Sequence, residues 1–192
     1  MSNRLPSITL IILFVAFSCT PSLAQSSFGR VNGAVVGIGG RSSGRSRLFS
    51  VTINRYTSAA EVAELNTARQ RSEDNMLTAL SRLNAGRIII GSNVGVTANA
   101  IIAEPWGDGG TKITVLYQRN VNFYEFRFGS RSQDFRFGYA EMFLDRNGRG
   151  EGTFISAARI RLRDGSTWEV EDFGVFPARL MGLRGSGTVT PR

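Results

Sequence analysis

From Gly86 onward the sequence consists of short apolar segments, separated by turns that contain glycine, in which hydrophobic and polar residues often alternate. Alternation with a period of two is typical of strands that bury one face. Asn147-Gly148 and Asp164-Gly165 are typical of tight hairpin turns. The expected strands lie near residues 87–90, 97–103, 112–117, 121–128, 135–144, 152–162, 167–172 and 179–183. Short turns between consecutive strands predict an antiparallel meander.

Two helices are predicted before this region. Ser58 and Glu61 have the spacing of a capping box, which predicts the start of the first helix. A second helix is expected from Ser72, and Gly86 comes just past its expected end. Its apolar face consists of Met76, Leu77, Leu80 and Leu83. A face of this kind indicates packing against a core, so we expect a helical hairpin that covers the sheet.

These patterns together predict the fold class. A further strand is expected near residues 47–55, where Phe49, Val51 and Ile53 share one face. We expect a mainly β, α+β domain in which an antiparallel meander of eight or nine strands forms a barrel or half-barrel. The helical hairpin would pack against this sheet, because the β-hairpins of the sheet carry apolar residues on both faces and the outer face needs a cover.

The first 24 residues have the pattern of a secretory signal peptide. Arg4 precedes an apolar run at 8–17, and Ser22-Leu23-Ala24 supplies small residues at a cleavage site. The run has about half of the roughly 20 apolar residues that a spanning helix needs. We therefore expect export to the periplasm or the extracellular space, with cleavage after Ala24. Lipid attachment at Cys19 is the alternative.

The rest of the chain divides into three predicted parts. Residues 25–46 are rich in glycine, serine and arginine, which predicts a flexible tether. Residues 47–185 are expected to form a single β-rich domain, and 186–192 a C-terminal tail. No disulfide is expected, since Cys19 is the only cysteine.

The chemistry available after residue 24 is restricted, because this part contains no histidine and no cysteine. Nucleophile systems that need histidine or cysteine, and metal sites built from imidazole or thiolate, are therefore excluded. We expect no cofactor, no metal site and no enzymatic activity. Chemistry based on carboxylates, tyrosine, serine or Lys112 stays open.

The formal net charge is +8, and all 23 basic residues except Lys112 are arginine. Codon composition can produce such a bias, but the charge also predicts an anionic partner. For an exported protein, lipid head groups, envelope polysaccharide or an acidic protein fit better than nucleic acid. The sequence leaves the oligomeric state open.

A two-residue turn at Asn147-Gly148 would set the register of one hairpin. It would place Phe143 opposite Gly152, Glu141 opposite Phe154, Tyr139 opposite Ser156 and Phe137 opposite Ala158. Glu141 would then lie on an aromatic inner face, where a carboxylate needs a partner. The predicted ligand-binding residues are Phe126, Phe137, Tyr139, Phe143 and Phe154, with Glu141 holding a polar end. The alternative is that these side chains fill the interior.

The next hairpin carries a row of arginines. A three-residue loop that includes Gly165 would place Arg159 and Arg161 opposite glutamates of the returning strand, Glu169 and Glu171. The row is then a solvated face with cross-strand ion pairs. In the alternative interpretation, Arg127 and Arg136 extend this row, and the four arginines face an anion.

Several stretches resemble a group of small exported bacterial β-rich proteins of unassigned function. The resemblance is carried by residues 145–153, 157–161, 168–174 and 178–182 and extends from about Phe49 to Leu183. It implies that this span is one domain, and it implies no activity or functional residue.

We therefore expect an exported, nonenzymatic binding protein, with a small apolar or amphipathic ligand held inside the β-domain. The alternative is an interaction or scaffold protein of the cell envelope that uses an arginine-rich outer face. The polar end of the chain and the short turns argue against an integral membrane protein.

Overall fold

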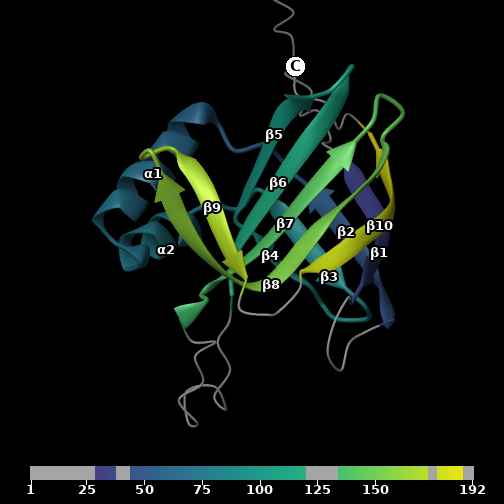
Figure 1. Cartoon of the computed structure of the whole chain (residues 1–192), viewed down its shortest axis with the longest axis horizontal. Helices are drawn as coiled ribbons and strands as arrows, with labels where there is room; N and C mark the ends of the chain where they lie inside the picture. The colour runs from purple at the N-terminus through teal and green to yellow at the C-terminus, as the bar shows by residue number, and fades with distance from the viewer. Residues whose placement is uncertain (1–28, 38–43, 120–133, 173–176, 188–192) are drawn as a thin grey trace, which may run out of the picture.

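The computed structural model describes residues 29–37, 44–119, 134–172 and 177–187, which form ten strands and two helices (Figure 1). The elements of the first half are β1 (Arg30–Val36), β2 (Ser46–Ile53), α1 (Ala59–Arg71), α2 (Glu73–Ser81), β3 (Gly86–Ile90) and β4 (Val96–Ala98). Those of the second half are β5 (Ala100–Trp106), β6 (Gly110–Gln118), β7 (Phe137–Leu144), β8 (Arg149–Arg163), β9 (Thr167–Asp172) and β10 (Ala178–Ser186). The predicted fold class is confirmed.

The strands form one antiparallel sheet in the order β4-β3-β2-β1-β10-β8-β7-β6-β5, curled into a nearly closed barrel, and β9 pairs with β8 outside this order. β4 pairs with β3 and β5 pairs with β6, so the two ends of this order meet at Asn99. The Asn99 side chain accepts a hydrogen bond from the Gln118 backbone at 2.9 Å and donates one to the Leu83 carbonyl at 3.1 Å. The predicted strand at 97–103 is therefore two strands, separated by this corner.

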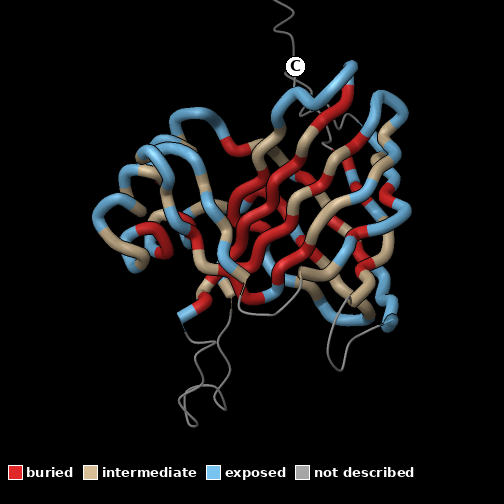
Figure 2. The backbone as a smooth tube through the Cα atoms, in the orientation of Figure 1, coloured by how far each residue is buried: buried red, intermediate tan, exposed pale blue. Residues whose placement is uncertain are grey.

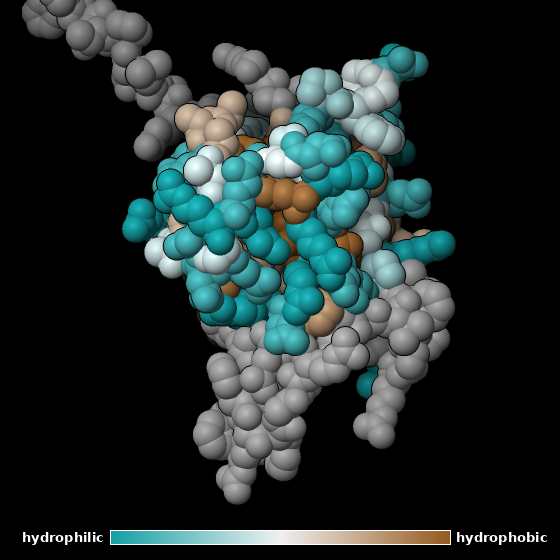
Figure 3. All heavy atoms as spheres, turned by 60° about the vertical axis from the view of Figure 1, so that its left-hand side comes forward, coloured by the Kyte–Doolittle hydropathy of each residue, from teal (hydrophilic) through white to brown (hydrophobic). Residues whose placement is uncertain are grey.

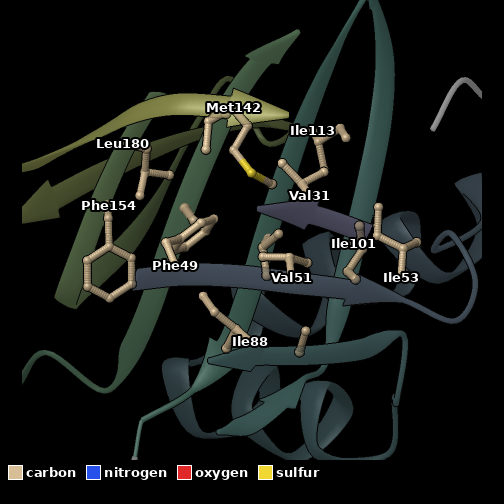
Figure 4. Close-up of a cluster of buried hydrophobic side chains, with 14 of the residues drawn as sticks. Val31, Phe49, Val51, Ile53, Ile88, Ile101, Ile113, Met142, Phe154 and Leu180 are labelled. Carbon is tan, nitrogen blue, oxygen red and sulfur yellow. The ribbon is translucent and has the colours of Figure 1, made fainter. Parts of the chain in front are cut away.

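Apolar side chains from most of the strands pack together inside the barrel. Phe49, Met142 and Leu180 come from strands far apart in the chain and meet in this core (Figure 4). The rings of Phe49 and Phe154 lie edge to face, with centroids 6.5 Å apart. The tube representation shows that buried residues concentrate along the central strands (Figure 2).

A second core lies between the outer face of the sheet and the helices. Leu65 of α1 and Leu80 of α2 belong to one buried cluster with Leu116, Phe137 and Ile160 of the sheet. α1 also holds the outer end of the β8–β9 hairpin, since Arg69 Nε donates to the Ile160 carbonyl at 2.7 Å and Trp168 Nε1 donates to Asn66 at 2.6 Å. The helical hairpin covers one side of the barrel, as predicted (Figure 1).

The predicted helix starts are confirmed, and the predicted role of Gly86 is wrong. Ser58 and Glu61 form the capping box of α1, and Ser72 caps α2. Helix α2 ends at Ser81, and Gly86 begins β3 instead. A Cβ at Gly86 would lie 2.0 Å from the Thr52 carbonyl oxygen. The glycine therefore permits close strand packing rather than a helix end.

The predicted flexible tether is wrong for residues 30–36, which form β1 between β2 and β10. Val31 is fully buried and Val35 nearly so. Gly33 is required by packing, because a Cβ there would lie 2.7 Å from Leu183 Cδ2 and 2.9 Å from the Met181 carbonyl oxygen. Glycines are common in linkers, but Gly33 is needed because β1 and β10 lie too close together here for a side chain. Of the other predicted tether residues, 25–28 and 38–43 lie outside the described residues, and so does the whole of the strand predicted at 121–128.

Substitution of Val31 by aspartate tests whether β1 belongs to the core. Val31→Asp places an unpaired carboxylate at a fully buried position, and we expect it to lower the free energy of unfolding by more than about 4 kcal/mol. Asn32→Asp changes the exposed neighbour and is expected to alter stability by less than about 0.5 kcal/mol. Urea denaturation measures both. Equal effects of the two substitutions would contradict the buried strand.

Candidate functional site

The β7–β8 turn has three residues, so the predicted register of this hairpin is wrong by one residue. The Asp145 amide donates to the Arg149 carbonyl at 2.8 Å, and the Gly148 amide donates to the Asp145 carbonyl at 2.9 Å. Asp145 Oδ1 accepts hydrogen bonds from the Asn147 and Arg149 amides, which stabilises this turn. Gly148 has φ +70°, as the closing residue of a three-residue hairpin loop requires.

A shift of one residue moves each side chain to the other face of the sheet. Glu141 lies opposite Thr153, whereas Ala140 lies opposite Phe154. The other two shifted pairs are Phe143 with Glu151 and Tyr139 with Ile155. An irregularity between Phe137 and Tyr139 restores the predicted pairing of Phe137 with Ala158. The observed register therefore differs from the predicted one only in the part of the hairpin nearer the turn.

The predicted ligand-binding residues consequently lie on three different surfaces. Phe154 lies in the barrel core, whereas Phe137 and Tyr139 belong to the cluster beneath the helices. Phe143 packs against Trp106 on the outside, with ring centroids 4.6 Å apart. Phe126 is outside the described residues. The structure does not bring the described members together around one interior site.

Glu141 lies on the outer face of the barrel in a cluster of charged side chains. Its Oε1 is 3.1 Å from Lys112 Nζ and accepts a hydrogen bond of 3.1 Å from the Tyr139 hydroxyl. Glu104 Oε2 is 3.4 Å from the same Lys112 Nζ. The Glu141 and Lys112 side chains are 25% and 28% exposed. The carboxylate thus has the partner that its half-buried position requires.

The electrostatics of this cluster favour the charged form of Lys112 and the neutral form of Tyr139. Burial alone would lower the pKa of Lys112, but the hydrogen bonds and charges of Glu141 and Glu104 outweigh burial and raise it. Burial, together with Glu141, raises the pKa of Tyr139. A lysine held cationic and a phenol held neutral are poorly suited to act as bases near neutral pH. The geometry fits an electrostatic contact between β5, β6 and β7.

The arginines predicted to face an anion have carboxylate partners in the structure. Arg136 pairs with Asp74 of α2, and Arg161 NH2 is 2.8 Å from Glu171 Oε2. Arg159 is 3.6 Å from Asp134 Oδ2, and its guanidinium lies 5.0 Å from the centroid of the Phe135 ring. Arg127 is outside the described residues.

The register predicted for this second hairpin is confirmed. Arg159 lies opposite Glu171 and Arg161 opposite Glu169, across a loop of residues 164–166. Arg163 NH1 is also 3.5 Å from Glu169 Oε1. The interpretation of this row as an ion-paired face therefore agrees with its described members.

A groove of about 380 Å³ also lies between α1 and α2. It is lined by Glu64, Thr67, Ala68, Arg71, Asn75, Thr78, Ala79 and Arg82. The helix side of the molecule is largely hydrophilic, with hydrophobic residues visible between the polar ones (Figure 3). The lining is predominantly polar, unlike the apolar pockets that hold most small ligands.

A different set of arginines lies on the outer face of β3, β2, β1, β10 and the start of β8. Of these strands, β1, β2 and β10 lie on the side of the barrel away from the helices (Figure 1). We call this surface the arginine face. Its arginines are Arg30, Arg87, Arg149, Arg179 and Arg184. The strand register aligns Arg184 with both Asn32 and Arg149, and Arg179 with Val36. These side chains alternate with the buried residues of the same strands, so they share the outer surface.

Charge compensation differs between the two sides of the barrel. On the helix side, Arg136, Arg159 and Arg161 each form an ion pair. Among the described residues, none of the five arginines of the arginine face forms an ion pair, and Glu151 is the one carboxylate on these strands that faces outward with them. Arg149 lies beside Asp145 at the rim, where its backbone hydrogen bond and its charge help to lower the pKa of Asp145.

The arginine face also exposes aliphatic side chains at its centre. Leu48 is 76% exposed and Met181 is 47% exposed. Ala34 lies between them, paired with Leu48 on one side and Met181 on the other. Reasoning from the sequence missed this surface because residues 25–46 were interpreted as a tether, which left β1 without a register. The alternation of Val31 and Val35 with Asn32 and Ala34 was the available signal.

No family model, curated protein or solved structure matches the chain. Neither of the two helices in the described ranges is long and apolar enough to cross a membrane.

A double-mutant cycle tests the Lys112–Glu141 contact. Lys112→Met leaves two carboxylates without their cation and is expected to lower the free energy of unfolding by about 2 kcal/mol. Adding Glu141→Gln should recover part of this loss, with a coupling energy of about 1 kcal/mol. The more exposed Arg161–Glu171 pair serves as the control and should show a coupling energy below about 0.5 kcal/mol. Urea denaturation measures both cycles, and equal coupling would contradict the assigned role of Lys112.

Proposed function

We propose that the protein is an exported, nonenzymatic binding protein that binds an anionic partner on the arginine face. This proposal takes up the alternative predicted from the sequence, an interaction function of an arginine-rich outer face, in place of the expected interior ligand, and assigns it to a different set of arginines. The observation that supports it is a set of five arginines on one surface, carried by β3, β1, β10 and the start of β8, that form no ion pair with any described residue. Cleavage after Ala24 and a partner in the cell envelope are part of the proposal.

Arginines that form no ion pair with a described residue present a stronger positive field to a partner than ion-paired arginines do. A carboxylate within hydrogen-bond distance of a guanidinium largely cancels its field at longer range. Neighbouring strands lie about 4.8 Å apart, which is less than the screening length of about 8 Å at physiological salt. The fields of arginines on adjacent strands therefore add together in front of this face.

The rival function, a ligand in the interior, receives less support from the geometry. The four described aromatic residues that would line the ligand are divided between the barrel core, the helix interface and the outside. Glu141, which would hold the polar end, is paired with Lys112 on the outer surface. The proposal of a nonenzymatic role rests on the cluster of Glu104, Lys112 and Glu141, in which Lys112 forms ion pairs with both carboxylates.

Retention on immobilised heparin, a model polyanion, tests the proposed function. The test variant is Arg30→Gln/Arg179→Gln/Arg184→Gln. We expect it to elute at clearly lower salt than the unmodified protein, and the slope of log affinity against log salt to fall by about three.

The control variant removes the same charge from the helix side, as Arg71→Gln/Arg82→Gln/Arg163→Gln. Arg71 and Arg82 line the groove between the helices, and the Arg163 side chain is 62% exposed. This variant should elute close to the unmodified protein. Equal losses in the two variants would mean that retention follows net charge alone, and the proposed function would be wrong.

A further inference from the structure

We infer that the anionic partner of the arginine face is a bilayer surface that contains anionic phospholipids. This inference rests on the proposed function and adds the class of partner. It is carried by the position of exposed aliphatic side chains among arginines for which the described part of the chain supplies no ion pair.

The aliphatic side chains lie inside the field of arginines. Along β10, Met181 lies between Arg179 and Arg184. Across the strands, Leu48, Ala34 and Met181 form one row over β2, β1 and β10. A purely ionic partner would leave Leu48 and Met181 in water. A bilayer surface accepts both kinds of group, because aliphatic side chains enter the region below the head groups while guanidinium groups bind phosphates.

The size of the face argues against a stable complex with an acidic protein. Five strands about 4.8 Å apart and about 24 Å long present an area of about 450 Å². A stable protein interface needs about 800 Å² on each partner. The outer surface of a barrel is also convex, which reduces contact with a rigid partner. A fluid bilayer adapts to this curvature, and its phosphates meet each arginine separately.

The composition of the face argues against a single-stranded nucleic acid. Such partners are bound by aromatic side chains on which bases stack, in addition to positive charge. Within the described part of the chain, the arginine face includes no aromatic side chain. This holds for the outward-facing residues of β3, β2, β1 and β10 and for those at the start of β8. The exposed apolar groups are aliphatic instead, which favours lipid over nucleic acid.

Co-sedimentation with vesicles tests the inference. One set of vesicles contains phosphatidylcholine with about 30% phosphatidylglycerol, a composition with clear negative surface charge, and the other contains phosphatidylcholine alone. The protein is used in the form purified from its producing cells, and every variant is prepared in that same form, so any contribution of the N-terminal segment cancels between variants. We expect binding to the anionic vesicles and much weaker binding to the neutral ones.

Three variants separate the contributions. Arg30→Gln/Arg179→Gln/Arg184→Gln should weaken binding to anionic vesicles about 100-fold, since each arginine near such a surface contributes about fivefold. Leu48→Gln/Met181→Gln should weaken it about tenfold while leaving elution from heparin unchanged. Arg71→Gln/Arg82→Gln/Arg163→Gln should stay within about threefold. Urea denaturation of each variant checks that its substitutions leave the protein folded.

The outcomes distinguish the inference from the function on which it rests. Retention on heparin without binding to anionic vesicles would overturn the lipid inference and leave the proposed function intact, with an acidic protein or polysaccharide as partner. Vesicle binding that Leu48→Gln/Met181→Gln does not weaken would also overturn it, since the aliphatic row would then have no role. Failure to bind either probe would overturn both.

Discussion

The pairing of β1 with both β2 and β10 joins the N-terminal strands of the sheet to its C-terminal strands. Without β1, β2 and β10 would each present an unpaired edge, and the interior could not be enclosed by one continuous sheet. Val31 contributes to the core from this strand, while Gly33 lets it approach Leu183 closely. The same strand places Arg30 and Ala34 between the exposed residues of its neighbours. The barrel and its arginine face therefore depend on the same contact.

The helical hairpin makes the two sides of the barrel chemically different. Packing of Leu65 and Leu80 against the sheet brings α1 and α2 close to the arginines of the nearby strands. Asp74 of α2 then pairs with Arg136, whereas Arg161 pairs with Glu171 of the neighbouring strand β9. On the side without helices, the five arginines of the arginine face form no ion pair with another residue that the structure describes. The arginine face therefore differs from the row Arg136, Arg159 and Arg161, whose members are ion-paired.

The number of residues in each hairpin turn determines which side chains share a face of the sheet. The three-residue turn after Asp145 places Glu141 outside with Lys112 and Phe154 inside with the core. A turn shorter by one residue would have placed Glu141 and Phe154 on one face. The second hairpin was predicted in its observed register because matching Arg159 with Glu171 required an odd loop. In the first hairpin both faces are apolar, so side-chain matching could not select the register.

The sequence by itself determined the local elements of this protein. Alternating apolar residues defined most strands, and hydrogen bonding by Ser58, Glu61 and Ser72 defined the helix starts, because these signals act within a few residues. The tertiary structure decided where the strand around Gly33 lies. The alternation of Val31 and Val35 indicates a strand, but its place between β2 and β10 depends on close contact with Leu183, far along the chain. The tertiary structure also decided which arginines lack a carboxylate. That property depends on which strands and helices become neighbours, and no local pattern specifies it.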